Sequence, residues 1–249
     1  MRKGWLLVAL LLLSTPAWSN EASLRKLSEV VSLSDLLMAS ALGYFNVHVR
    51  SPDERSLTSI YASFYTLEMC MAHLGQPPAQ ARPLAQIKML LAKLEALPAS
   101  QRGRYPELLQ QLLNEHQKLR RAAAGAYAEL RDGSDNIEQM INEQSHDLSS
   151  LLVDYQIRHY PEIAPSQRIF SASEQEVLTT SIDQRFKTLL TEQPEQAEAL
   201  GKVNTQYRFI RAQLLNPGGR WQAGVEFYLS RAVLDLQELA VLWSTRSGQ

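Results

Sequence analysis

The sequence contains a single cysteine, Cys70, among its 249 residues. A lone cysteine excludes an internal disulfide, so the stability of the chain has to come from its apolar core. After residue 20 there is also no apolar, charge-free run of the roughly 20 residues that a helix needs to cross a bilayer. We therefore expect no membrane insertion of the chain that follows residue 20.

An excess of charge of one sign is missing as well. The 25 lysines and arginines nearly balance the 26 aspartates and glutamates, which gives a formal net charge of −1. Chains that bind nucleic acids carry a basic excess on the binding surface. The composition therefore predicts no nucleic-acid partner.

The motifs of the common catalytic and cofactor sites are absent. The chain has no Gly-x-Ser-x-Gly, His-Glu-x-x-His, Gly-x-Gly-x-x-Gly, Gly-Lys-Ser/Thr phosphate loop or Cys-x-x-Cys-His haem motif. We expect a protein that is not an enzyme and that holds no cofactor.

The first nineteen residues have the pattern of a secretory signal peptide. Arg2 and Lys3 precede an apolar run over residues 5–13, and the small-residue pattern Ala17-Trp18-Ser19 follows. Cleavage is expected after Ser19, and no cysteine follows at the position of a lipid anchor. The mature protein, residues 20–249, is predicted to be periplasmic or secreted.

Strand patterns are nearly absent, whereas apolar residues recur at steps of three and four almost everywhere. These stripes predict an all-α antiparallel bundle of about eight helices. They cover residues 27–45, 57–74, 84–97, 109–130, 137–155, 178–190, 200–214 and 225–243. One helical domain is expected, with possible sub-halves 20–132 and 133–249 that meet at the turn over residues 132–135.

Local patterns indicate two helix starts and one internal echo. Ser171-x-x-Glu174 and Asp135-x-x-Glu138 are typical of N-terminal caps. The hairpin between Phe45 and Phe64 has nearly the length of the hairpin between Phe209 and Phe227, as a duplicated helical hairpin would produce. Chance spacing of amphipathic helices explains the echo equally simply.

The most metal-like composition lies in the segment Met69-Cys70-Met71-Ala72-His73, whose soft ligands would suit Cu(I). On a helix only Met69 or Cys70 can share a face with His73, and no second cluster supplies further ligands. Core packing is the better interpretation of this segment.

Two other histidines stand in helical patterns. Glu143-x-x-His146 is half of a di-iron ligand pattern, but both residues flank their stripe, so we expect a solvated surface pair. His116 lies on the stripe of residues 109–130 and is either a pH sensor or, as we prefer, a neutral core histidine bonded to a carbonyl or to a buried side chain such as Gln144.

The strongest candidate for a ligand site is a set of arginines near the C-terminus. Arg208 and Arg211 lie three residues apart beside Tyr207, and Arg220 follows the glycine turn at residues 216–219. Exposed backbone N–H groups at a helix start and nearby arginines together favour an anion. Ordinary solvated arginines are the alternative.

The segment Asn-Thr-Gln-Tyr-Arg-Phe at residues 204–209, followed by a turn and the long helix 227–242, resembles the periplasmic helical sensor modules of pilus-type chemotaxis transducers. In that family an arginine-bearing bundle reads a ligand or a partner and signals through a membrane helix. The resemblance implies a detached binding module, with Arg208 as the first residue carried across.

The sequence therefore predicts an exported helical module that binds a small anionic ligand or a partner protein. Two alternatives stay open. The near-heptad stripes of residues 57–74 and 225–243 would also suit a scaffold that self-associates. The Met69, Cys70 and His73 segment would suit a periplasmic copper-binding protein.

Overall fold

The structure, a computed structural model, describes residues 16–48, 53–131, 137–216 and 219–247. These ranges form eight α-helices joined by turns and three short 3-10 helices, and they contain no β-strand. The all-α bundle predicted from the stripes is confirmed. The helices are α2 (Pro16–Tyr44), α3 (Glu54–His73), α4 (Pro78–Ala96), α5 (Tyr105–Leu130), α6 (Ile137–Arg158), α7 (Ala172–Glu192), α8 (Ala197–Leu215) and α9 (Ala223–Ser247).

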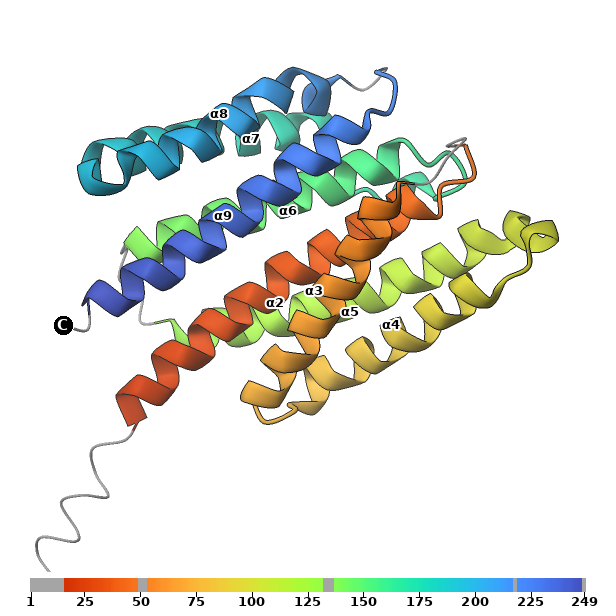
Figure 1. Ribbon diagram of the computed structural model, residues 1–249, viewed down its shortest axis with the longest axis horizontal. Helices are drawn as coiled ribbons and strands as arrows, with labels where there is room; N and C mark the ends of the chain where they lie inside the picture. The colour runs from red at the N-terminus through yellow and green to blue at the C-terminus, as the bar shows by residue number, and fades with distance from the viewer. Residues whose placement is uncertain (1–15, 49–52, 132–136, 217–218, 248–249) are drawn as a thin grey trace, which may run out of the picture.

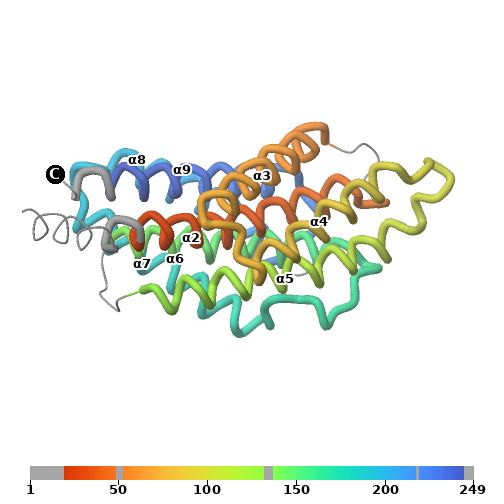
Figure 2. The backbone as a smooth tube through the Cα atoms, turned by 90° about the horizontal axis from the view of Figure 1, so that it is seen from below, coloured from red at the N-terminus to blue at the C-terminus, as the bar shows by residue number. Residues whose placement is uncertain are grey.

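Helices α2 and α6 form the centre of the molecule. Helix α2 packs against α3, α5 and α6, while α6 packs against α2, α7 and α9. Figure 1 shows α4 and α5 on one side of α2 and α6 to α9 on the other, with α3 crossing α2 obliquely. Figure 2, turned by 90°, shows that most helices run along the length of the bundle.

The two central helices run parallel, unlike the antiparallel hairpins expected for neighbours in sequence. Ser28 on α2 bonds to His146 on α6, and Asn46, just after α2, bonds to the carbonyl of His159, just after α6. Contacts therefore advance in the same direction along both helices. The connection through α3, α4 and α5 makes this parallel pairing possible.

The apolar stripes meet in one continuous core to which all eight helices contribute. Helix α2 differs from the others because it is buried almost all the way round from Val30 to Leu42. A helix buried on every side also buries its polar residues, and those residues then need partners within the protein. This burial places the side chains of the candidate site.

Helix ends follow local chemistry. Ser171 and Glu174 form a reciprocal capping box at the start of α7, as predicted. Asp53 caps α3 by accepting from the N–H of Arg55, and Gly75, with φ of 76°, follows the end of α3 in the left-handed conformation. The predicted cap at Asp135 lies outside the described residues.

The same order of helix neighbours occurs twice. In residues 16–130, α2 packs on α3 and α5, and α4 packs on α5; in residues 137–247, α6 packs on α7 and α9, and α8 packs on α9. Two short sequence matches occupy equivalent places at one constant spacing: residues 78–81 (Pro-Ala-Gln-Ala) with 194–197 (Pro-Glu-Gln-Ala), and 103–105 (Gly-Arg-Tyr) with 219–221 (Gly-Arg-Trp). The packing therefore makes the four helices α2–α5 equivalent to the four helices α6–α9. The duplication considered from the sequence was a different one, because it matched the hairpin α2–α3 with the hairpin α8–α9.

Most of the predicted leader, residues 1–15, lies outside the described residues. The described chain begins in α2, which includes the expected cleavage point after Ser19. None of the described helices combines the length and the apolar character needed to span a membrane.

Candidate functional site

Asp35 is a fully buried carboxylate at the centre of the fold. It lies on α2, where α5 and α6 pack against that helix. Nε2 of His116 on α5 lies 2.7 Å from Oδ1, and the hydroxyls of Ser149 and Ser150 on α6 lie 3.0 Å from Oδ2. Three helices are thus joined at one side chain.

Arg120 supplies the counter-charge one turn beyond His116. Its Nε lies 3.2 Å from Oδ1 of Asp35, and its Nη2 donates to Oγ of Ser150 at 2.6 Å. Burial alone would raise the pKa of Asp35, but the charge of Arg120 and the hydrogen bonds from His116 and Ser149 outweigh it and lower the pKa to about 2. Asp35 is therefore ionised at neutral pH.

His116 has a second ring nitrogen that the protein leaves unused. Nε2 is occupied by Asp35, whereas Nδ1 is buried and has no hydrogen-bond partner within the described ranges. A buried polar atom without a partner costs about 1–3 kcal/mol. A bound molecule that reaches this atom would recover that free energy.

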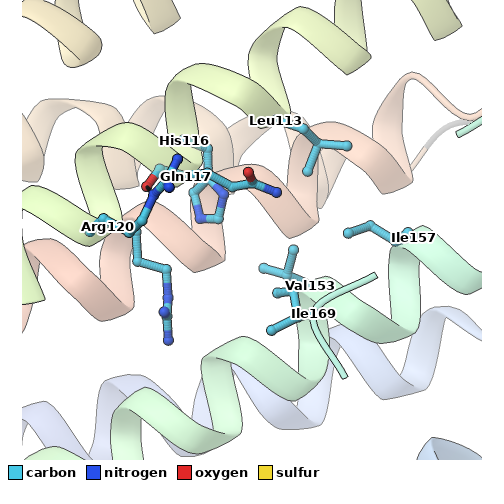
Figure 3. A pocket seen from close by; sticks show the side chains of 8 residues that line it. Leu113, His116, Gln117, Arg120, Val153, Ile157 and Ile169 are labelled. Carbon is cyan, nitrogen blue, oxygen red and sulfur yellow. Dashed lines mark hydrogen bonds between the residues drawn. The ribbon is translucent and has the colours of Figure 1, made fainter. Parts of the chain in front are cut away.

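A pocket of about 210 Å³ opens beside this network, between α5 and α6. One wall is polar and basic, formed by His116, Gln117, Arg120 and Arg121. The other is apolar, formed by Leu113, Val153, Ile157 and Ile169. Figure 3 shows the side chains from the two helices and from the segment that precedes α7 facing one space.

The segment that carries Ile169 is held in place by a second buried carboxylate. Asp154 on α6 accepts from the backbone N–H groups of Ile169 and Phe170 at 3.0 and 3.2 Å and from Nε2 of Gln175 at 2.6 Å. It also pairs with Arg158 at 3.1 Å. Asp154 thereby fixes the segment of Ile169 to α6, the helix that supplies the rest of the apolar wall of the pocket.

The geometry suits binding better than acyl transfer. The hydroxyls of Ser149 and Ser150 approach the carboxylate of Asp35, and no hydroxyl in the described residues bonds to His116. A serine nucleophile would need a hydrogen bond to the imidazole of its base. The two arginines outnumber the single carboxylate, so the basic wall favours a negative group.

The expectations about the two histidines differ in outcome. His116 is bonded to a buried side chain, but this side chain is Asp35; the amide of Gln144 contacts the carbonyl of Ile182 and Arg185 instead. His146 does not form a solvated pair with Glu143. Its Nε2 lies 2.9 Å from Oγ of Ser28 in the α2–α6 interface, and burial lowers its pKa to about 4.

The arginines singled out in the sequence lie elsewhere. Tyr207 is buried against Phe186, and Arg211 lies beside its hydroxyl and pairs with Asp183 on α7 at 3.0 Å. Arg208 and Arg220 are exposed, and neither takes part in an ion pair among the described residues. The structure brings together Tyr207 and Arg211 but shows no contact that joins Arg208 or Arg220 to them.

The residues of the proposed copper segment point in different directions. Met69 is 55% exposed and His73 is exposed, whereas Cys70 is buried and its thiol donates to Glu29 at 3.4 Å. Burial, followed by the charge of Glu29, raises the pKa of Cys70 to about 12. No group of three or more His, Cys, Asp or Glu side chains in the described chain could hold a metal ion.

The sequence reasoning missed Asp35, although one signal was present. Residues 28–40 carry Ser28, Ser32, Ser34, Asp35 and Ser40 between long apolar residues. Small polar residues on every side of an apolar helix indicate a helix that is buried all round and bonded to several neighbours.

Comparisons with known proteins returned nothing that bears on this pocket. No protein-family model matches the chain, no curated protein matches it, and no solved structure matches it.

Proposed function

We propose that the protein is a non-catalytic binding protein that takes a small organic anion with a short apolar chain into the pocket between α5 and α6. The observation that carries the proposal is the pairing of a basic wall, Arg120, Arg121 and His116, with an apolar wall in one cavity. Arginine is the side chain best suited to carboxylates, because its planar fork donates two parallel hydrogen bonds.

The size of the cavity limits the ligand. A water molecule takes about 30 Å³ of liquid, so a volume of about 210 Å³ equals that of about seven water molecules and limits the ligand to a small one. A short-chain carboxylate fits this volume, with its charge at Arg120 and Arg121 and its chain against Val153 and Ile157. The predicted leader would place such a binding protein outside the cytoplasm.

Thermal unfolding with a carboxylate series tests the proposal. Sodium acetate, butyrate and hexanoate at matched ionic strength are compared with the neutral butyramide and hexanamide. We expect Tm to rise with the carboxylates and with chain length, because a ligand that binds only the folded state stabilises it. The amides lack the charge and are expected to give smaller shifts.

Matched variants locate the site. Arg121→Gln leaves the contacts of Asp35 intact and is expected to reduce the carboxylate shift, and Arg120→Gln is expected to abolish it. Arg208→Gln replaces an exposed arginine on α8 and is the control. A shift lost in Arg208→Gln and kept in both pocket variants would move the site to α8, the place that the sequence favoured.

Self-association is the second candidate function, and one observation favours it. Phe227, Leu234 and Val241 recur every seven residues on α9 and are 52%, 45% and 39% exposed. An apolar stripe at this spacing suits a helix–helix contact between copies. Sedimentation at micromolar concentration, with Leu234→Glu as the disrupting variant, distinguishes a stable oligomer from a monomer.

A further inference from the structure

Three carboxylates of the described chain are more than nine-tenths buried, and one of them differs from the others in its partners. Asp35 pairs with Arg120, and Asp154 pairs with Arg158. Glu226, on the first turn of α9 and 8% exposed, takes part in no ion pair among the described residues. Buried charges in proteins are normally paired, so the lack of an ion pair sets Glu226 apart from the other two.

The protein surrounds Glu226 with neutral donors. Nε2 of Gln156 on α6 donates to Oε2 at 3.0 Å, and Trp221 fixes that amide by donating its indole N–H to Oε1 of Gln156 at 2.8 Å. Burial raises the pKa of Glu226, and the hydroxyls of Ser56 and Ser40 act in the opposite direction. Neutral donors hold the carboxyl group, and no basic side chain of the described chain forms an ion pair with it.

Space for this carboxyl group is built into α2. A Cβ atom at Gly43 would come within 2.7 Å of Oε2 of Glu226. No other described glycine has a side-chain atom that near to the place of its missing Cβ. The glycine lets a charged group approach the backbone of the central helix.

A cavity of about 170 Å³ lies against Glu226, between the start of α3 and the start of α9. Trp221 and Phe227 give it aromatic walls, and Ser230 lines it with a buried hydroxyl that has no partner in the described part of the chain. The hydroxyl oxygen of Ser230 can accept a hydrogen bond from a bound donor.

The charged groups at the rim are already paired. Arg55 forms an ion pair with Asp53 at 2.8 Å and lies 5.8 Å above the ring of Phe227, and Arg231 pairs with Asp235 at 2.8 Å. Glu226 is thus the one lining carboxylate that forms no ion pair in the described chain, and the charge of Arg55 acts on it only from the rim. The position of Arg55 also shows that the face of Phe227 accepts a cation.

We propose that this cavity binds a small organic ammonium ion, whose charge is neutralised by Glu226 and whose alkyl part lies against Trp221 and Phe227. The ammonium N–H groups would donate to the carboxylate and to the hydroxyl of Ser230. A metal ion is a poorer occupant, because the cavity offers one buried carboxylate and aromatic walls in place of several oxygen ligands.

The repeated packing order relates some of the elements that line the two cavities. Helix α9 takes the position of α5, and the start of α3 takes that of the segment before α7. The first cavity has a basic wall, and the second has a buried acid. The ammonium site does not depend on the anion site.

Thermal shift and calorimetric titration with n-propylammonium chloride test the proposal, with 1-propanol and sodium chloride as matched controls. At about 20 mM ligand we expect Tm to rise with the amine and not with the alcohol, because binding to the folded state alone stabilises it. Glu226→Gln keeps the size of the side chain and one acceptor oxygen, removes its charge, and is expected to weaken amine binding at least tenfold. Glu238→Gln removes an exposed acid of the same helix and is expected to leave amine binding unchanged.

Each outcome decides the question. No shift of the unmodified protein with any alkylammonium, or an equal shift in Glu226→Gln, would overturn the proposal and leave Glu226 a neutral structural acid. If Glu226→Gln does not fold, Phe227→Ala is the second variant, because it alters a half-exposed ring of the cavity. It is expected to weaken n-propylammonium binding several-fold. Unchanged affinity for n-propylammonium in this variant would also refute the site. The butyrate shift is expected to persist in Glu226→Gln, so failure of either site is distinguishable from failure of the other.

Discussion

The carboxylate of Asp35 and Nε2 of His116 lie 2.7 Å apart, and both side chains are at most 2% exposed. The two residues are 81 positions apart in sequence, so the contact forms only when α2 and α5 pack. It joins the polar centre of the fold to the wall of the anion pocket. Substitution of Asp35 therefore tests how much the fold relies on this centre.

Asp35→Asn keeps the shape of the side chain and removes the charge that faces Arg120. We expect the free energy of unfolding at pH 7 to fall by about 3 kcal/mol, because a buried ion pair broken from one side leaves the other charge uncompensated. Urea denaturation measures the change. Glu192→Gln, an exposed acid at the end of α7, is the control and is expected to change stability by less than about 0.5 kcal/mol. Equal effects of the two variants would show that Arg120 is satisfied without Asp35.

His146 predicts a specific pH dependence. Its pKa is about 4 in the folded state because burial disfavours the charged ring, whereas an unfolded histidine titrates near 6.5. Between these values the unfolded chain binds more protons, so the contribution of His146 is fully present above about pH 6.5 and is lost as the pH falls toward 4.

The corresponding measurement is urea unfolding of the unmodified protein and of His146→Gln, at pH 7 and at about pH 4.5. We expect the stability difference between the two proteins to shrink by about 1–3 kcal/mol at the lower pH, since each unit of pKa shift corresponds to about 1.4 kcal/mol. Other acidic groups titrate in both proteins and cancel in the difference. A difference that does not change with pH would place the ring of His146 in water.

Two glycines in helices predict opposite effects of the same substitution. Gly43→Ala on α2 places a methyl group 2.7 Å from Glu226 and is expected to cost about 1–3 kcal/mol. Gly125→Ala on α5 meets no atom within 4 Å and is expected to gain about 0.5–1 kcal/mol through helix propensity. Thermal or urea unfolding of both variants measures the contrast. Stabilisation by both would mean that the carboxyl group of Glu226 can move aside without loss.

The capping box of α7 gives a local prediction. Ser171→Ala removes the acceptor of the N–H of Glu174 and is expected to destabilise the protein by about 1 kcal/mol. Ser100→Ala, at an exposed position in the short 3-10 helix before α5, is the control. Urea unfolding of the pair reports the difference, and equal stabilities would show that the helix end frays without cost.

The class of the fold could be predicted from the sequence because helical periodicity is a local property. The stripe of residues 109–130, for example, placed Leu112, His116 and Leu119 on one buried face, and the structure buries all three. The capping box at Ser171 was predictable for the same reason, since its two partners are three residues apart.

The candidate site could not be predicted, because its contacts are tertiary. The stripe showed that His116 is buried, but nothing in the spacing of residues 109–130 pointed to Asp35 on another helix. Helical phase placed His146 beside its stripe, and the parallel packing of α2 then covered that position with Ser28. Residues near Arg208 in the sequence predicted an anion pocket there. A pocket, however, depends on which helices pack together, and the spacing of residues within one segment does not determine that.

Two smooth apolar helices in parallel can slide past each other by one turn, about 5.4 Å, with little change in buried surface. The interface between α2 and α6 instead contains specific hydrogen bonds between hydroxyl and imidazole groups. They pair Ser28 with His146 and Ser32 with Ser145. A slip of one turn would break each of these bonds at once. These bonds thus fix the axial position of α2 relative to α6. They also keep the walls of both pockets aligned, although those walls come from opposite halves of the chain.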